Sequence, residues 1–192
     1  HRPATNSDPR PMAAASVSLD AVSADLVGEL ERVRAGETTA QSLPLRGAML
    51  VEADLSDLDL SACDLSGADL SRANLEGARL FGAKLGGATL FEVKADGAEL
   101  AGADLTGANL ADGSFERAGF GRAVLAGADL SNARLAGASL TSADLSRAIL
   151  AAADLRDARL CDVTLSGADL THATLDEADL TGASVDGARF DH

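Results

Sequence analysis

The sequence has no tryptophan and no tyrosine, and phenylalanine occurs only five times in 192 residues. Large aromatic side chains usually help to fill a wide hydrophobic core, so this scarcity favours an interior narrow enough for leucine and alanine. No apolar run reaches the roughly 18 residues of a membrane-spanning helix. The N-terminus also lacks the charged start and apolar stretch of a signal peptide. We therefore expect a cytoplasmic protein that does not bind a membrane.

Histidine is scarce as well, with three residues in all, one of them at position 1. We find no Ser/His/Asp or Cys/His arrangement that would support nucleophilic catalysis. His172 and His192 lie 20 residues apart near Asp169 and Asp191, and two imidazoles at that spacing could share a metal ion. Two exposed polar residues explain the same pair more simply. We expect no enzymatic activity, no cofactor and no metal site.

What the chain has in abundance is a repeat of five residues. From position 45 to 190 every fifth residue is leucine, except at Ala95, Phe115, Phe120, Val185 and Phe190. The residue two before this central position is nearly always alanine, and the one just before it is often aspartate or asparagine. A short, strict period predicts a solenoid of one repeated unit, which serves as a surface rather than as a catalytic pocket.

The segments 68–71 (ADLS), 103–107 (ADLTG) and 108–110 (ANL) resemble the A-(D/N)-L-x-x signature of the pentapeptide-repeat family. Thirty such units in one phase cover roughly three quarters of the chain. The resemblance implies an all-β solenoid, a right-handed quadrilateral β-helix with four pentapeptides per coil and about 7.5 coils of 20 residues. It also implies that the central residue and the one two before it point inward, while the other three point outward.

The charges support a coil of 20 residues independently. Residues 20 apart would stack about 4.8 Å from one another, where like charges repel. Three columns at this spacing alternate in sign instead: Asp64-Lys84-Asp104, Asp59-Arg79-Glu99 and Glu52-Arg72-Glu92.

The interior positions show the same period. Ala95 replaces an expected leucine, and Phe115, one coil later, is larger than leucine. Val93 is oversized at its position, and Gly113, again one coil later, is undersized. We read these exchanges, together with Phe120, as core packing in which volume is compensated, with Phe115 occupying space left by Ala95.

The first 44 residues do not follow the repeat. Residues 1–16 are rich in proline, serine and alanine and predict a disordered leader. Residues 17–44 predict a capping helix and a hinge, and residues 45–192 the β-helix. The helix should run from its N-cap Ser18 to Arg34 and cover the edge of the first coil. Its apolar stripe is Leu19, Val22, Leu26, Leu30 and Val33.

Two cysteines fall nearly five coils apart, Cys63 at an inward position and Cys161 at an outward one. This separation exceeds what a disulfide can bridge, and two free thiols suit a reducing compartment.

The surface charge is strongly acidic, with a net charge of −14. Outward residues sum to −5 on the face with central residues Leu70 and Leu90, and to −5 on the next face, with Leu75 and Phe115. We call these the Leu70 face and the Leu75 face; the other two carry about −1 each. This pattern opposes nucleic-acid binding and suits a partner protein with a basic surface. The candidate partner-binding residues are Glu76, Asp96, Glu116, Asp157 and Glu177.

The corners differ between faces. On the face with central residue Leu65, the last position of the pentapeptide is glycine in seven of eight repeats, whereas on the Leu70 face it is never glycine. Repeated glycine predicts a turn with a positive φ angle at that corner. A different turn is expected at the next corner.

Two functions fit this sequence. The first is a non-catalytic scaffold, a rigid acidic rod that presents a surface to another protein. The second follows from the family resemblance, because some relatives resemble B-form DNA in size and charge, bind the type II topoisomerase gyrase and confer quinolone resistance. This chain has leucine rather than phenylalanine at most centres and no loop between repeats. Its open last coil predicts either a homodimer through that edge or a longer natural chain.

Overall fold

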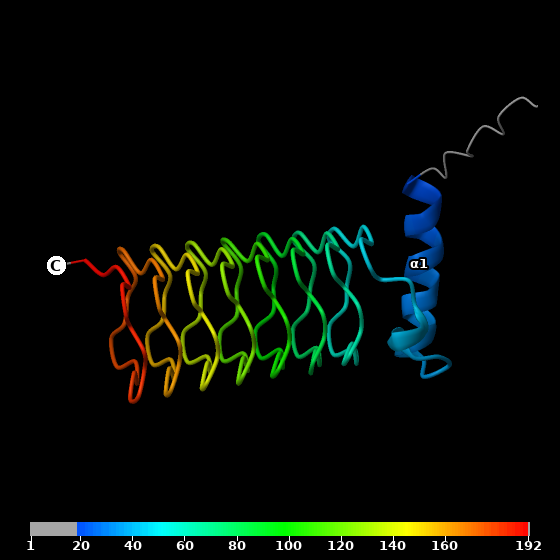
Figure 1. The fold of residues 1–192 in the computed structure, drawn as a ribbon. Helices are drawn as coiled ribbons and strands as arrows, with labels where there is room; N and C mark the ends of the chain where they lie inside the picture. The colour runs from blue at the N-terminus through cyan, green and yellow to red at the C-terminus, as the bar shows by residue number, and fades with distance from the viewer. Residues whose placement is uncertain (1–18, 192) are drawn as a thin grey trace, which may run out of the picture.

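The protein is described by a computed structural model that covers residues 19–191 and consists of one helix joined to a long rod (Figure 1). Helix α1 spans Leu19–Arg34, and a short 3-10 helix, η1, spans Ala40–Ser42. The predicted leader (1–16), the N-cap Ser18 and His192 lie outside the described residues.

The rod is a stack of coils linked by parallel bridges between residues 20 apart, from Met49–Asp69 to Asp169–Arg189. The bridges are isolated rather than joined into long strands, because each side of a coil turns a corner after a few residues. The coils lie side by side along the rod in Figure 1. The predicted right-handed quadrilateral β-helix with 20-residue coils is confirmed.

Main-chain hydrogen bonds repeat with the same register. Each central residue donates its N–H to the carbonyl 19 residues later, as Leu70 does to Thr89 at 2.7 Å. Thr89 donates back to Ala68 at 2.9 Å, and Ala73 closes the corner by donating to Leu70 at 2.9 Å. The ladder therefore satisfies buried main-chain groups that would otherwise be costly to desolvate.

Leucine and alanine fill the interior as the repeat predicts. From Leu45 to Leu170 the central residue and the residue two before it are buried in nearly every pentapeptide, and the other three positions are largely outside. Cys63 is buried, as its inward position predicts. In the last described coil the inward residues Val185 and Phe190 remain 43% and 37% exposed.

The predicted difference between the two kinds of corner is wrong. The last residue of every pentapeptide between 47 and 187 is left-handed, whether it is glycine or not. Gly67 has a φ of 66°, and Arg72, at the next corner, has a φ of 57°. A non-glycine residue pays roughly 1 kcal/mol for this conformation. Glycine is therefore favoured at these corners, but hydrogen bonding and stacking of the coils impose the geometry on any residue.

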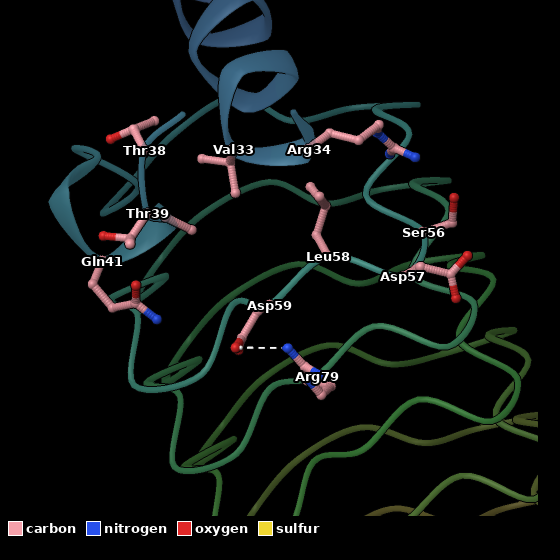
Figure 2. Close-up of a pocket in the computed structure, with 11 residues that line it drawn as sticks. Val33, Arg34, Thr38, Thr39, Gln41, Ser56, Asp57, Leu58, Asp59 and Arg79 are labelled. Carbon is pink, nitrogen blue, oxygen red and sulfur yellow. Dashed lines mark hydrogen bonds and ion pairs between the residues drawn. The ribbon is translucent and has the colours of Figure 1, made fainter. Parts of the chain in front are cut away.

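Helix α1 covers the N-terminal end of the rod. Leu26 and Leu30 are buried, and Val33 packs partly buried against the same core. Leu58 stands where most pentapeptides have alanine, and its side chain points toward Val33 and Arg34 (Figure 2). The side chains of Leu19 and Val22 lie outside the described residues. The larger Leu58 therefore extends the core into contact with the cap.

Two side chains before the rod continue its hydrogen-bond register. The Arg34 guanidinium donates to the Asp54 carbonyl at 3.0 Å, and the Gln41 amide donates to the Ser61 carbonyl at 2.7 Å. In the coils below, the equivalent carbonyls accept main-chain N–H groups, as Asn74 does from Leu55 at 2.8 Å. Both side chains sit 20 residues before their acceptors, so they replace part of a missing coil.

Candidate protein-interaction surface

The five acidic residues predicted to bind a partner differ in their accessibility. Glu76, Asp157 and Glu177 are exposed, whereas Asp96 and Glu116 are half-buried. All five belong to the Leu75 face, Glu76 near the cap and Glu177 near the far end of the rod. They lie along one side of the rod but do not form one continuous acidic column.

Asp96 is held within the fold. One of its carboxylate oxygens accepts a hydrogen bond from the Ser114 hydroxyl at 2.6 Å and another from the Glu116 N–H at 2.8 Å. Both donors belong to the next coil, so this carboxylate bridges two coils. A side chain used in this way contributes charge to the surface but is not free to reorient toward a partner.

Glu116 forms an ion pair with Arg134, which lies 18 residues later. The column Glu76, Asp96 and Glu116 contains no cation when residues are compared at a spacing of 20. An outward residue just after the centre also lies beside the residue just before the centre in the next coil, and this diagonal spacing is 18. Arg46 with Asp64 at 3.5 Å, and Cys161 with Asp179 at 3.1 Å, use the same diagonal.

The columns with alternating charge behave partly as predicted. Arg72 pairs with Glu52 and Arg79 with Asp59, each at 2.9 Å. Exposed pairs of this kind contribute little stability, typically below about 1 kcal/mol. They set the local balance of charge rather than hold the coils together.

Many of the remaining acids have a structural task at the corners. An aspartate just before the central leucine accepts hydrogen bonds from the residue two positions later, as Asp104 does from the Thr106 hydroxyl at 2.6 Å and N–H at 3.0 Å. These bonds favour the ionised form and lower the pKa of the aspartate. For Asp179, with Thr181 as main donor, the pKa falls to about 2. The pKa is lowered at Asp54, Asp59, Asp64, Asp104, Asp154, Asp169 and Asp179.

The predicted core residues lie at the middle of the rod. Phe115 and Phe120 are fully buried, with ring centroids 5.5 Å apart in an edge-to-face arrangement. Val93 and Ala95 are buried one coil earlier. A Cβ atom added to Gly113 would lie 2.6 Å from Cε2 of Phe115. The Phe115 ring therefore occupies the space of a missing side chain in its own pentapeptide.

A pocket of about 400 Å³ opens where the cap meets the rod (Figure 2). Thr38, Thr39 and Gln41 line it from the linker, and the ion pair of Asp59 with Arg79 lines it from the rod. Polar and apolar groups line it in about equal measure. On another side of α1, a groove of about 490 Å³ runs along the segment 49–54.

The cysteine and histidine residues form no reactive cluster in the described part of the chain. Burial raises the pKa of Cys63 to about 11, and a hydrogen bond to the Asp179 carboxylate raises the pKa of Cys161. Nδ1 of His172 lies 2.6 Å from Asp191. Residues 19–191 hold no group of three potential metal ligands, and no helix among them is long and apolar enough to cross a membrane.

A four-sided β-helix with regular pentapeptides and a surface of outward polar residues defines a repeat protein. The chain belongs to the family described as pentapeptide repeats, whose model matches residues 45–77, 59–94, 83–122, 118–157 and 153–191. HetL, a pentapeptide repeat protein involved in heterocyst differentiation regulation in the cyanobacterium Nostoc sp. strain PCC 7120, is 38% identical. The match covers 75% of this chain and 73% of HetL, with a TM-score of 0.36.

QnrB1, a plasmid-mediated fluoroquinolone resistance protein, is 21% identical, with a TM-score of 0.54. That match covers 78% of this chain and 86% of the QnrB1 chain, and it shows a shared fold. A pentapeptide repeat protein from the thylakoid lumen of Arabidopsis thaliana is 31% identical over 54% of this chain and 69% of its own, with a TM-score of 0.40. No curated protein matches the sequence significantly.

Proposed function

We propose that this protein is a non-catalytic scaffold whose acidic rod binds a basic surface of a partner protein. The observation that carries the proposal is the group of exposed carboxylates on the Leu75 face that form no ion pair among the described residues, which includes Glu76, Asp157 and Glu177. The neighbouring Leu70 face adds a further −5. Such a field steers a basic partner toward the rod and favours its binding.

The positions of the cations on the Leu75 face indicate which parts of this face a basic partner can contact. Lys94, Arg117 and Arg134 lie in the middle of the Leu75 face or at its corner, and Arg134 neutralises Glu116. The fourth cation of this face, Arg156, pairs with Asp154. The free carboxylates cluster nearer the two ends of the rod. A partner with two separated basic patches therefore suits this surface better than one with a single basic stripe.

Charge-neutral variants test the proposal. Glu76→Gln, Asp157→Asn and Glu177→Gln together raise the net charge by 3, and Asn tolerates the left-handed backbone at 157. The matched control, Ser66→Lys, Ala126→Lys and Ser166→Lys, raises the charge equally on the face with central residue Leu65. We expect partners captured from a cell lysate by the wild type to be lost with the first variant and kept with the second. Equal capture by both variants would contradict the proposal.

The second candidate is a DNA mimic that binds gyrase and confers quinolone resistance. The fold shared with QnrB1, together with the two adjacent acidic faces, favours it. The many aspartates used as corner caps weigh against it, because their positions follow the turns of the coil rather than the spacing of phosphates. A supercoiling assay with purified gyrase and a quinolone separates the two candidates. Protection from the drug supports the mimic, and an unchanged drug response excludes it.

A further inference from the structure

The first full coil, residues 48–67, receives one hydrogen bond from the preceding chain on each of three of its four sides. Arg34 and Gln41 supply two of these bonds through their side chains, as described above. On the third side the Gly47 N–H donates to the Ser66 carbonyl at 3.0 Å. The fourth side is the segment Met49–Val51.

This fourth side receives no hydrogen bond from the preceding chain, whereas each of the other three sides receives one. Met49 bridges Asp69 below it, and that bridge uses the neighbouring groups of Ala48 and Leu50. The N–H and C=O of Met49 and the C=O of Val51 form no hydrogen bond among the described residues. One coil lower, the N–H of Asp69 donates to Ala48 and its C=O accepts from Leu50. The segment 49–51 is therefore an open β edge.

The side chains at this edge are also unusual for the rod. Met49 and Val51 are 43% and 39% exposed. The residues at the position of Met49 in the next four coils are Asp69, Thr89, Asn109 and Asp129. An unpaired edge is usually protected by charged side chains, whereas this one carries two apolar residues.

The groove of about 490 Å³ lies between this edge and helix α1. The buried Leu30 and Leu50 line it, and Glu31 adds a carboxylate from the helix, whereas the Glu52 carboxylate is paired with Arg72 at 2.9 Å. Arg34 also lines it, but its guanidinium is engaged with Asp54 at 3.6 Å. The groove opens on the Leu70 face, which sums to −5. Its surroundings are therefore apolar within and acidic outside.

We propose that the edge Met49–Val51 binds an extended segment of a partner protein, which adds to the β-helix in place of a preceding coil. The segment has an apolar centre, for the groove, and Lys or Arg on its flanks, for the acidic face. This proposal rests on the proposed function and gives it a location.

The register of the rod specifies the contact. All bridges between neighbouring coils are parallel, so the bound segment should run parallel to residues 49–51. The peptide residue just before the one opposite Met49 accepts a hydrogen bond from the Met49 N–H through its C=O. The peptide residue just after it donates its N–H to the Met49 C=O. Two positions further on, a second N–H donates to the Val51 C=O, as Glu52 does to Ser71 at 2.9 Å.

The probe is the labelled peptide Lys-Thr-Val-Leu-Thr-Gly-Lys, with valine opposite Met49, and the readout is fluorescence anisotropy with the full chain. N-methylation of leucine and glycine removes the two donors and should weaken binding at least about tenfold. N-methylation of valine and the second threonine, whose N–H groups point away from the edge, should leave binding unchanged. Equal loss with both methylated peptides, or no binding at millimolar peptide, would overturn the proposal.

A matched pair of protein variants tests the location. Met49→Asp places at the edge the charged residue that later coils have, and it should weaken peptide binding about tenfold. Ile149→Asp makes the same change five coils later, where the residue is 42% exposed but bridged on both sides by Asp129 and Asp169. It should leave binding unchanged. Equal effects of the two variants would refute the edge as the site.

The result also separates this proposal from the function on which it rests. If the partner binds the acidic face elsewhere, the neutral variant of Glu76, Asp157 and Glu177 loses partner capture while Met49→Asp retains it. If the edge binds the peptide but the scaffold proposal fails, Met49→Asp loses the peptide while the neutral variant changes no captured partner.

Discussion

The contact between Phe115 and Gly113 gives a quantitative test of the packing in the rod. Most pentapeptides have alanine two residues before a leucine, whereas here glycine precedes phenylalanine. A Cβ on Gly113 would lie 2.6 Å from the Phe115 ring, so Gly113→Ala alone should overpack the core and cost about 1–3 kcal/mol. Phe115→Leu alone should cost about 1–1.5 kcal/mol, because the smaller side chain leaves part of the interior unfilled.

The double variant restores the usual alanine and leucine. If the two sites were independent, their costs would add to about 2–4.5 kcal/mol. We expect a cost near 1 kcal/mol or less, because the new methyl group enters space that the ring has left. The measurement is equilibrium urea unfolding followed by circular dichroism. Gly119→Ala is the control, since nothing lies within 4 Å of an added Cβ there. Additive costs would show that the ring does not occupy the space beside Gly113.

Three further predictions follow from the corners, the acids and the far end of the rod. Ala152→Gly should stabilise the protein by about 0.5 kcal/mol in urea unfolding, because residue 152 has a φ of 58°; a loss would contradict strain at this corner. The free energy of unfolding should be constant above about pH 5 and fall towards pH 2, because aspartates such as Asp179 have a lower pKa folded than unfolded; a flat profile from pH 5 to 2 would contradict the corner caps. Light scattering of residues 1–192 should give about twice the 19.4 kDa chain mass, since the apolar side chains of Val185 and Phe190 are exposed in the last described coil, and Phe190→Asp should restore the monomer; a single-chain mass at every concentration would exclude this dimer.

The sequence predicts the fold well because one short rule governs most of the chain. Leucine at each central position and alanine two residues earlier specify which side chains point inward, and the alternating charges at a spacing of 20 specify the coil. The N-terminal cap was predicted from the helical stripe alone. The sequence does not predict how the cap aligns with the first coil, because the hydrogen bonds of Arg34 and Gln41 depend on how the linker folds back.

The backbone conformation at the corners could not be predicted from the glycine pattern. Glycine marks a left-handed residue reliably, but its absence at Glu52 and Arg72 does not mark a different turn. Each corner is fixed by the hydrogen bonds of the coils above and below, which are long-range in sequence. Within residues 19–191, sixteen non-glycine residues adopt the left-handed conformation, and the hydrogen-bond ladder offsets a cost of roughly 1 kcal/mol at each.

The sequence predicts the net charge of each face, but it does not predict which carboxylates are paired. Comparison at a spacing of 20 finds the residues that bridge directly, whereas Arg134 reaches Glu116 along the diagonal of 18. The same diagonal joins Ser114 to Asp96. A carboxylate engaged in this way is part of the scaffold, so a sum of charges overstates what a partner can contact. The acids available for recognition are those that neither spacing pairs, and Glu76 and Glu177 meet that condition at opposite ends of the rod. Because these two residues are separated by five coils, or about 24 Å at about 4.8 Å per coil, a single small basic patch cannot contact both, and recognition through both requires basic groups on the partner at a similar separation.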